Sequence, residues 1–211
     1  MTLILHDIAL TAPGAAAPLF APLTLTVPPG VVATVMGPSG VGKSSLLDLI
    51  GGHLARGFRW TGRVTLEGGD LLPLPAEARR VGVLFQDAHL FPHLSVGDNL
   101  AFGLSAQVRG RAARRAAVDQ ALDRAGLAGM ARRDPATLSG GQRARAALMR
   151  TLLARPRAIL LDEPFSRLDA GLRAEIRAFV LDHIRAEAIP AILVTHDPED
   201  ARAAAGPIVT L

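Results

Sequence analysis

The sequence contains no cysteine among its 211 residues. The fold therefore depends on no disulfide, and no thiolate is present to hold a metal ion. Long hydrophobic runs are also missing. The most apolar helical candidate, residues 144–154, is interrupted by Arg145 and Arg150, whereas a membrane span needs about 18 consecutive apolar residues. The first residues, MTLILHDIAL, lack the basic start of a secretory signal, so we interpret them as a first strand.

The excess of positive charge is small, because 23 basic residues meet 19 acidic ones and the formal net charge is +4. Arginines 109, 111, 114 and 115 could form a nucleic-acid patch, but they alternate with alanine and no aromatic residue lies among them for base stacking. This spacing is typical of the solvated face of an amphipathic helix. We therefore expect no nucleic-acid partner.

Strand-like and helix-like segments divide the chain into two kinds of region. Residues 87–155 are rich in alanine and arginine at helical spacing and contain no convincing strand. We predict an α/β fold with a mixed or parallel sheet core, in which residues 1–86 and 156–211 form the core lobe and residues 87–155 an inserted helical subdomain of one 1–211 domain. The predicted strands are Leu3–Leu5, Leu23–Val27, Val31–Met36, Ala158–Leu161 and Ala191–Val194.

A glycine-rich loop, GPSGVGKSS, lies between the third strand and a helix-like segment. The segment from Gly37 to Ser44 matches the P-loop pattern, in which backbone N–H groups surround a phosphate at the start of a helix. Lys43, the only lysine in the chain, would reach the phosphates, and Ser44 would offer a hydroxyl to Mg²⁺. An ordinary glycine-rich turn is the alternative, but the strand before and the helix after are what a P-loop requires.

Two further motifs accompany the P-loop. LSGGQ at 138–142 opens a predicted helix that runs to Pro156, with Ser139 as its N-cap and two glycines whose N–H groups can approach a phosphate. A buried strand then ends in Asp162 and Glu163. Neighbours on a strand point to opposite sides, so we expect different tasks: Asp162 at the Mg²⁺ and Glu163 polarising the attacking water.

The order and spacing of these motifs resemble those of the ABC-type ATPase family, over essentially the whole chain. Gln86 in VLFQD, the segment Ser166–Asp169, and His196 in VTHD complete the set. The resemblance implies a P-loop NTPase of the ABC-ATPase fold that binds and hydrolyses MgATP, with Glu163 and His196 catalytic. The implied ATP-binding residues are Gly37, Pro38, Ser39, Gly40, Val41, Gly42, Lys43, Ser44, Ser45 and Gln86; those that bind ATP in trans are Ser139, Gly140, Gly141, Gln142 and Asp169; those at the metal are Ser44, Gln86 and Asp162.

The resemblance also implies partners. ATP would lie between two copies of the chain, and dimer closure would move a separate multi-span permease, most simply in an importer that can include a substrate-binding protein. The subunit would then lie on the cytoplasmic side, at the inner face of the membrane. Nothing in the sequence names the transported substrate.

Two other function classes fit less well. A soluble ABC ATPase of DNA repair or ribosomes would be expected to carry a second cassette, a coiled coil or zinc-binding or RNA-binding segments, and a metabolite kinase would have no use for LSGGQ or His196. Two features depart from the family pattern. The stretch LTAPGAAAPLF has no aromatic residue for adenine before Phe20, and Arg167 replaces a small residue. After His196, 15 residues leave room for one short helix and one strand.

Overall fold

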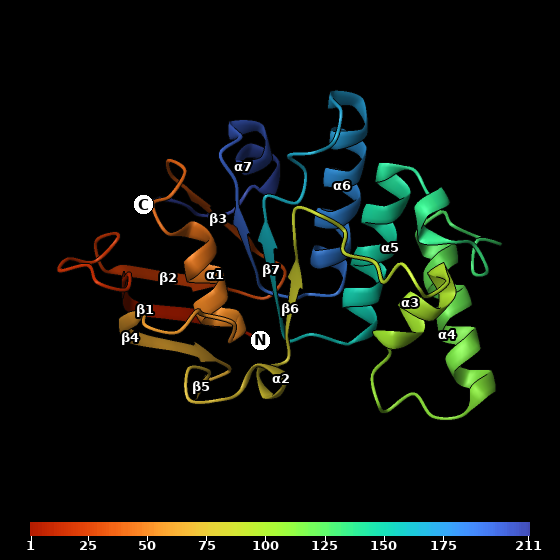
Figure 1. The fold of residues 1–211 in the computed structure, drawn as a ribbon, viewed down its shortest axis with the longest axis horizontal. Coiled ribbons are helices and arrows are strands. Elements are labelled where there is room, and N and C mark those ends of the chain that lie inside the picture. Colours follow the sequence, from red (N-terminus) through yellow and green to blue (C-terminus); the bar gives the residue numbers. More distant parts are fainter. The chain divides into compact units, whose positions relative to one another are not determined.

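The computed structural model describes all residues from 1 to 211 and contains two sheets (Figure 1). The strands are β1 (Leu3–Thr11), β2 (Leu23–Val27), β3 (Val32–Met36), β4 (Arg59–Leu66), β5 (Gly69–Asp70), β6 (Val81–Leu84), β7 (Ala158–Asp162), β8 (Ala191–Val194) and β9 (Ile208–Thr210). The helices are α1 (Lys43–Gly51), α2 (Ala76–Arg79), α3 (Val96–Phe102), α4 (Arg111–Arg124), α5 (Gly140–Leu153), α6 (Ala170–Ala186) and α7 (Pro198–Ala204), with a 3₁₀ turn at Pro135–Thr137.

The chain divides into two compact units. The first comprises Met1–Val83, Arg157–Glu163 and Leu181–Leu211, and the second comprises Leu84–Pro156 and Pro164–Val180. Helix α6 begins in the second unit and ends in the first. No helix of the structure has the length and apolar character that a membrane span requires.

The larger sheet has the order β6-β7-β8-β3-β9, and strands β7, β8, β3 and β9 are parallel. Every residue of β8 is buried, as is β7 from Ala158 to Leu161. Such strands read as unbroken apolar runs because both faces of the sheet are covered. The two predicted buried strands and their parallel pairing are thus confirmed, and α7 and β9 supply the helix and strand expected after His196.

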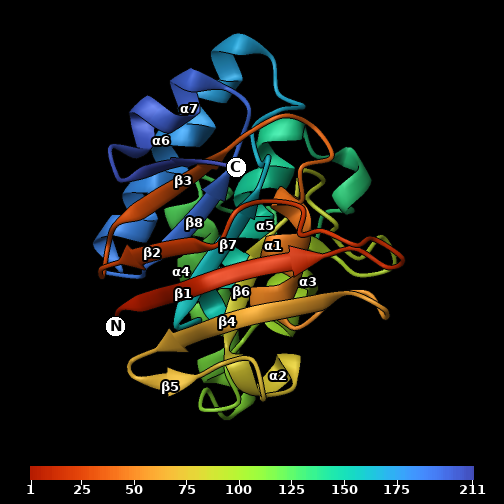
Figure 2. The ribbon, with the colours of Figure 1, turned by 90° about the vertical axis from the view of Figure 1, so that its left-hand side faces the viewer.

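The antiparallel strands form a second sheet of order β2-β1-β4-β5 (Figure 2), and this separation from the parallel sheet was not foreseen from the sequence. Its strand β2 buries Leu23, Leu25 and Val27 and exposes the threonines between them, as expected for a sheet with one covered face. The predicted strand Leu3–Leu5 is longer than expected and continues to Thr11. The core of the first unit joins the covered face of this sheet to α1 and to residues of β3, β7 and β8.

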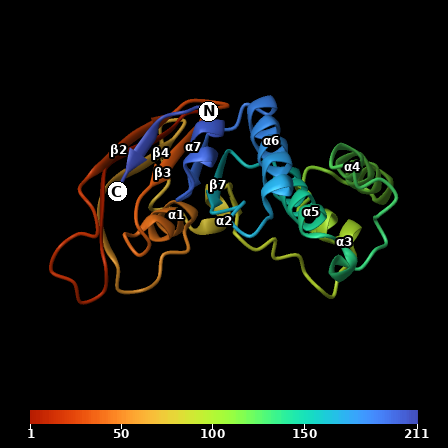
Figure 3. The same cartoon turned by 90° about the horizontal axis from the view of Figure 1, so that it is seen from above.

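The second unit contains α3, α4 and α5, which pack together (Figure 3). No strand lies between residues 87 and 155, as predicted. Helix α4 buries Val118, Ala121 and Leu122, while Arg111 and Arg115 are exposed. The interpretation as a solvated helix face thus holds for Arg111 and Arg115. Arg109 precedes the helix, and Arg114 is partly buried and donates to the Ala101 carbonyl at 2.8 Å.

Candidate functional site

The glycine loop leads directly into α1, and the start of that helix has no side-chain cap. Gly42, the residue before the helix, has a φ of 107° and lacks a side chain that could cap it. The first turn carries no acidic residue. Helix N-termini attract anions because their first N–H groups have no partner within the helix and the dipole is positive there. This end of α1 can therefore accept a phosphate.

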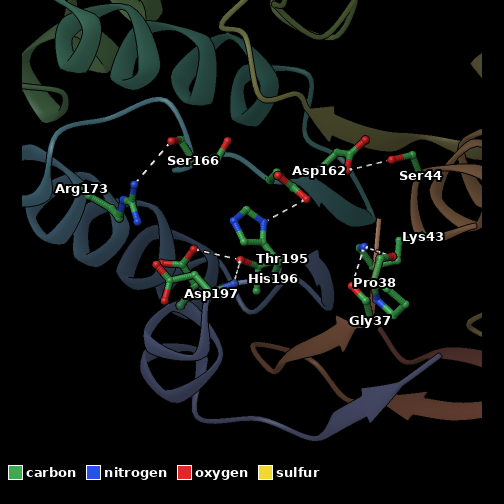
Figure 4. A network of polar contacts seen from close by, with 12 residues as sticks. Gly37, Pro38, Lys43, Ser44, Asp162, Ser166, Arg173, Thr195, His196 and Asp197 are labelled. Carbon is green, nitrogen blue, oxygen red and sulfur yellow. Dashed lines mark hydrogen bonds and ion pairs between the residues drawn. The ribbon is translucent and has the colours of Figure 1, made fainter. Parts of the chain in front are cut away.

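Lys43 supplies a cation to the same loop. Its side chain is buried, and Nζ donates hydrogen bonds to the carbonyl oxygens of Gly37 at 2.8 Å and Pro38 at 2.9 Å (Figure 4). An ammonium group has three donors, so these two contacts leave one for a ligand. The loop and its lysine thus hold a positive charge in place beside the start of α1.

Ser44 and Asp162 bring two oxygen ligands together at the edge of the parallel sheet. The Ser44 hydroxyl donates to Asp162 Oδ1 at 3.2 Å. Burial raises the pKa of the Asp162 carboxyl, the Ser44 hydrogen bond opposes this shift, and neighbouring Glu163 adds to it. Hydroxyl and carboxylate oxygens suit Mg²⁺, which keeps waters and phosphate oxygens as its other ligands. The structure contains no group of three or more His, Cys, Asp or Glu side chains that could hold an ion by itself, so this pair fits a metal that arrives with a phosphate.

Glu163 does not lie on the strand, and our strand-based argument about its direction was wrong. Strand β7 ends at Asp162, and Glu163 has a φ of 45°, a conformation uncommon outside glycine. Its N–H donates to the Val194 carbonyl at 3.0 Å. Residues held in sparsely populated backbone regions cluster at active sites. The side chains of Asp162 and Glu163 point in different directions because the chain turns at Glu163, and not because neighbours on a strand alternate.

His196 lies against Glu163. Its Nδ1 is 3.2 Å from Glu163 Oε1, and the exposed fractions of the two side chains are 65% and 26%. A carboxylate next to a largely exposed imidazole can exchange a proton with a small molecule and pass charge to the ring. Glu163 follows β7 and His196 comes just after β8, and the parallel pairing of these two strands brings the residues together. Their contact could not be read from the sequence.

The sequence analysis missed the residues that support His196. Thr195 and Asp200 are almost completely buried, and the Thr195 hydroxyl donates to Asp200 Oδ2 at 3.1 Å. The same hydroxyl accepts a hydrogen bond from the Asp197 N–H at 3.0 Å. Thr195, directly before His196, is thus bonded to Asp197, directly after it, and to Asp200 on α7 (Figure 4). Threonine and aspartate four to five residues apart are too common to signal such a network from sequence.

The LSGGQ motif forms the predicted start of α5, in the second unit. Ser139 is the N-cap and accepts from the Gln142 N–H at 3.2 Å, while Gln142 Oε1 accepts from the Ser139 N–H at 3.0 Å. This reciprocal capping box is confirmed as a local feature. A Cβ atom on Gly141 would lie 2.6 Å from Leu172 Cδ1, whereas one on Gly140 would meet nothing closer than 3.8 Å. A side chain at position 141 would therefore require Leu172 to shift, whereas one at position 140 would meet only an ordinary contact.

Asp169 and Gln86 also belong to the second unit. Asp169 Oδ1 accepts a hydrogen bond from the Leu172 N–H at 3.0 Å, next to the start of α6. Gln86 is exposed and lines a pocket of about 320 Å³ together with Gly140. The structure gives Asp169 a local capping contact, and it leaves the Gln86 amide at a surface.

Phe20, the candidate for stacking on adenine, is buried in the core with an exposed fraction of 7%. Its ring packs near the glycine loop, because a Cβ on Gly42 would lie 3.3 Å from Phe20 Cε1 and 2.9 Å from Leu19 Cδ1. Leu211 supports the other end of the loop, with its N–H bonded to Met36 and its carbonyl 3.0 Å from a Cβ built on Gly37. These long-range supports of the loop had no signal in the sequence.

Comparison with known proteins accounts for this set of residues. Residues 20–166 match the family model described as ABC transporter. The chain belongs to the ABC transporter family. It is 53% identical over 178 residues to the uncharacterised ABC transporter ATP-binding protein YnjD of Escherichia coli strain K12, covering 84% of this chain and 82% of that protein. It is 48% identical over 168 residues to the thiamine import ATP-binding protein ThiQ of Cereibacter sphaeroides, covering 80% of this chain and 71% of that protein.

A solved structure extends the likeness to the fold. The ATP-binding cassette MJ0796, determined as a dimer in a post-hydrolysis state with ADP and Pi, superposes with a TM-score of 0.80 at 28% identity and covers 99% of this chain and 94% of that one. The predicted ABC-ATPase fold is thus confirmed. This ABC protein is an ATP-binding subunit and an ATPase.

Proposed function

We propose that this ABC subunit hydrolyses ATP at sites shared between two copies of the chain, and that hydrolysis drives a separate membrane permease. One observation carries the proposal: Lys43, Ser44, Asp162, Glu163 and His196 form two close polar pairs and a buried cation around the glycine loop. The MJ0796 dimer with ADP and Pi supports the shared site by similarity.

The nucleotide phosphates bind to the loop from Gly37 to Ser45, where the N–H groups at the start of α1 and the Lys43 ammonium neutralise their charge. Ser44 and Asp162 would hold Mg²⁺, with Gln86 as a third contact. When bound, the ion supplies positive charge to the β- and γ-phosphate oxygens. Base contacts contribute little, since Phe20 is buried.

Glu163 acts on the attacking water. Its carboxylate accepts a proton from the water while the oxygen of the water bonds to the γ-phosphorus, and the bond from that phosphorus to the β–γ bridging oxygen breaks, so that ADP leaves. His196 holds the γ-phosphate and the water in line, and its Nδ1 contact with Glu163 keeps both side chains on one side of the turn. The backbone strain at Glu163 favours a fixed direction for this carboxylate.

The partner copy completes each site with the start of its α5. Ser139, Gly140, Gly141 and Gln142 approach the γ-phosphate in trans, and the N–H groups of the two glycines donate to it. Asp169 links the two sites across the dimer. Because Ser139 and Gln142 satisfy each other in the free subunit, the motif is ready formed before the partner arrives.

A complementation assay tests the shared site. Lys43→Ala removes the phosphate contact, and Gly140→Asp places a negative charge where the partner's phosphate would bind. Gly140 has open space around it, so an acidic side chain in the first turn should not disturb the fold. Each variant alone should be inactive, yet a mixture should regain ATPase activity, because a mixed dimer has one intact site. No recovery in the mixture, with wild-type activity present, would contradict the shared site.

The permease contact lies in the segment from Asp87 to Leu94. Asn99, completely buried, bonds the N–H and carbonyl of Phe91 and so fixes the segment. His93 is exposed beside it, and Phe102 on α3 is 69% exposed and stacks edge-on with Phe91. An apolar surface with aromatic anchors suits a cytoplasmic helix of a multi-span protein. Leu90 and Leu94 are only partly buried and add to it.

The direction of transport is inward, as in the import system that ThiQ is named for, with the subunit at the cytoplasmic face and a substrate-binding protein outside. A crosslink tests the contact. Because the chain has no cysteine, His93→Cys introduces a single thiol, which should form a disulfide with a cysteine in a cytoplasmic loop of the co-expressed permease. Ala136→Cys, at an exposed site outside this surface, is the matched control. No crosslink in a scan from Leu90 to Leu94 would contradict the contact.

A further inference from the structure

An ion pair in the second unit joins two segments that lie 80 residues apart in the sequence. Arg167 Nη1 donates to Asp87 Oδ1, and the two side chains are 59% and 46% exposed. Asp87 directly follows Gln86, and Arg167 lies two residues before Asp169. The pair therefore joins the motif that contains Gln86 to the motif that contains Asp169, through a neighbour of each of these two residues.

The Arg167 end of the pair is anchored by its own surroundings. Phe165 is completely buried, and Arg173 Nη2 donates to the carbonyl oxygens of Ser166 at 3.4 Å and Leu168 at 3.3 Å. The backbone that carries Arg167 is thus held on both sides. Because the backbone of Arg167 is fixed, its guanidinium can hold the Asp87 carboxylate in one position.

Beyond its contact with Arg167, the Asp87 end is held by the residues that follow it, beginning with the Ala88 carbonyl, which accepts from Arg150 Nη2 at 3.5 Å. Arg150 Nη1 donates to the His89 carbonyl at 2.9 Å, and the bonds from Asn99 to Phe91 follow. Before these anchors the side chains face outward, since Phe85 is 44% exposed and Gln86 is exposed as well. The contact of Asp87 with Arg167 is therefore the anchor next to Gln86.

Packing does not replace this contact, because a pocket lies beside the segment. Residues 84–88 and Arg167 line the pocket of about 320 Å³ described above, and Phe165 and Leu168 form part of its wall. A segment beside an open pocket lacks the dense contacts that fix core side chains. A directional, charge-assisted hydrogen bond from a planar guanidinium is suited to hold it.

We propose that Arg167 is a positioning residue that, through Asp87, fixes Gln86 relative to the segment leading to Asp169. This inference rests on the proposed roles of Gln86 and Asp169. Arg167 itself touches no substrate. The ion pair between Arg167 and Asp87 holds the two segments in one relative arrangement. Gln86 then meets the nucleotide in the same geometry at each turnover.

A charge-swap cycle on the isolated full-length subunit tests the proposal. Arg167→Glu and Asp87→Arg each place like charges opposite one another, and the double variant restores an ion pair in reverse. Exposed pairs have small coupling energies, so each single variant should lower kcat about two- to fivefold with an unchanged KM for ATP. The double variant should recover most of the loss. Amide hydrogen exchange over residues 84–88 should rise in the single variants and fall again in the double variant.

The control is the exposed pair of Arg115 and Asp119 on α4 in the same unit. Arg115→Glu should change neither kcat nor exchange over residues 84–88. Wild-type kcat in both single variants, a raised kcat, or a double variant no better than the singles would overturn the positioning role of Arg167, whatever the exchange data show. An inactive wild-type chain would instead overturn the proposed function, and hydrogen exchange would still report on the contact between Arg167 and Asp87.

Discussion

The two motif groups of this ABC subunit differ in how their polar side chains are satisfied. Around the glycine loop, contacts join separate elements: Ser44 on α1 meets Asp162 on β7, and Glu163 meets His196 after β8. At the start of α5, Ser139 and Gln142 satisfy each other within four residues. The first group depends on the tertiary fold, whereas the second needs only a helix N-terminus. This division suits the proposed site, whose second half would arrive on another copy.

The largest effect should come from the first group. Glu163→Gln keeps the size of the side chain but removes its basicity, so kcat should fall by about 10²- to 10⁴-fold, as for loss of a general base. ATP binding should persist, because the glycine loop and Lys43 are unchanged. Steady-state ATPase assays give kcat, and a sizing column run with MgATP should show the variant as a dimer.

Glu77→Gln, an exposed acidic residue on α2 of the same unit, is the matched control and should retain full activity. Wild-type turnover by Glu163→Gln would remove this residue from its proposed role as base. It would also show that the strained turn after β7 serves the fold alone.

The support beneath His196 should have an intermediate effect. Thr195→Val keeps the shape but deletes the hydroxyl that bonds Asp200 and the Asp197 N–H. Loss of a hydrogen bond to the buried Asp200 carboxylate costs about 1–3 kcal/mol, so the free energy of unfolding should fall, and kcat should fall with little change in KM. Thr195→Ser keeps the hydroxyl and should restore kcat. Equal kcat values for the two variants would show that the network does not position His196.

Much of the fold and of both motif groups could be predicted from the sequence, for physical reasons that differ from element to element. The glycine loop, the Ser139 cap and the buried strands at Ala158 and Ala191 are local patterns, in which spacing alone determines the conformation. The antiparallel sheet was missed because its strand β4 is exposed over most of its length and carries no apolar alternation. The turn at Glu163 was missed because its positive φ falls on a residue other than glycine.

The adjacent glycines of the second group separate packing from function. Gly141→Ala should unfold more easily than Gly140→Ala by about 1–3 kcal/mol, because its methyl group would press on the Leu172 side chain. Both substitutions gain the same helix propensity. The difference between their free energies of unfolding therefore measures the clash with Leu172. Urea unfolding of the two variants measures it. Equal stabilities would mean that Leu172 moves aside freely and that Gly141, like Gly140, serves only the phosphate.

The smallest effect should be the preference between nucleotide bases. Stacking of a base on an aromatic side chain contributes about 1–3 kcal/mol, but Phe20 is buried in the core beside Gly42, so its ring does not face a bound adenine. Phosphates and Mg²⁺ then dominate affinity, so the dissociation constants of ATP and GTP should agree within about tenfold, or 1.4 kcal/mol. Competition binding measures the ratio. Phe20→Leu, which keeps an apolar group in the core, should lower stability without changing that ratio. A preference for ATP above about a hundredfold, lost in Phe20→Leu, would show that Phe20 leaves the core to stack on the base.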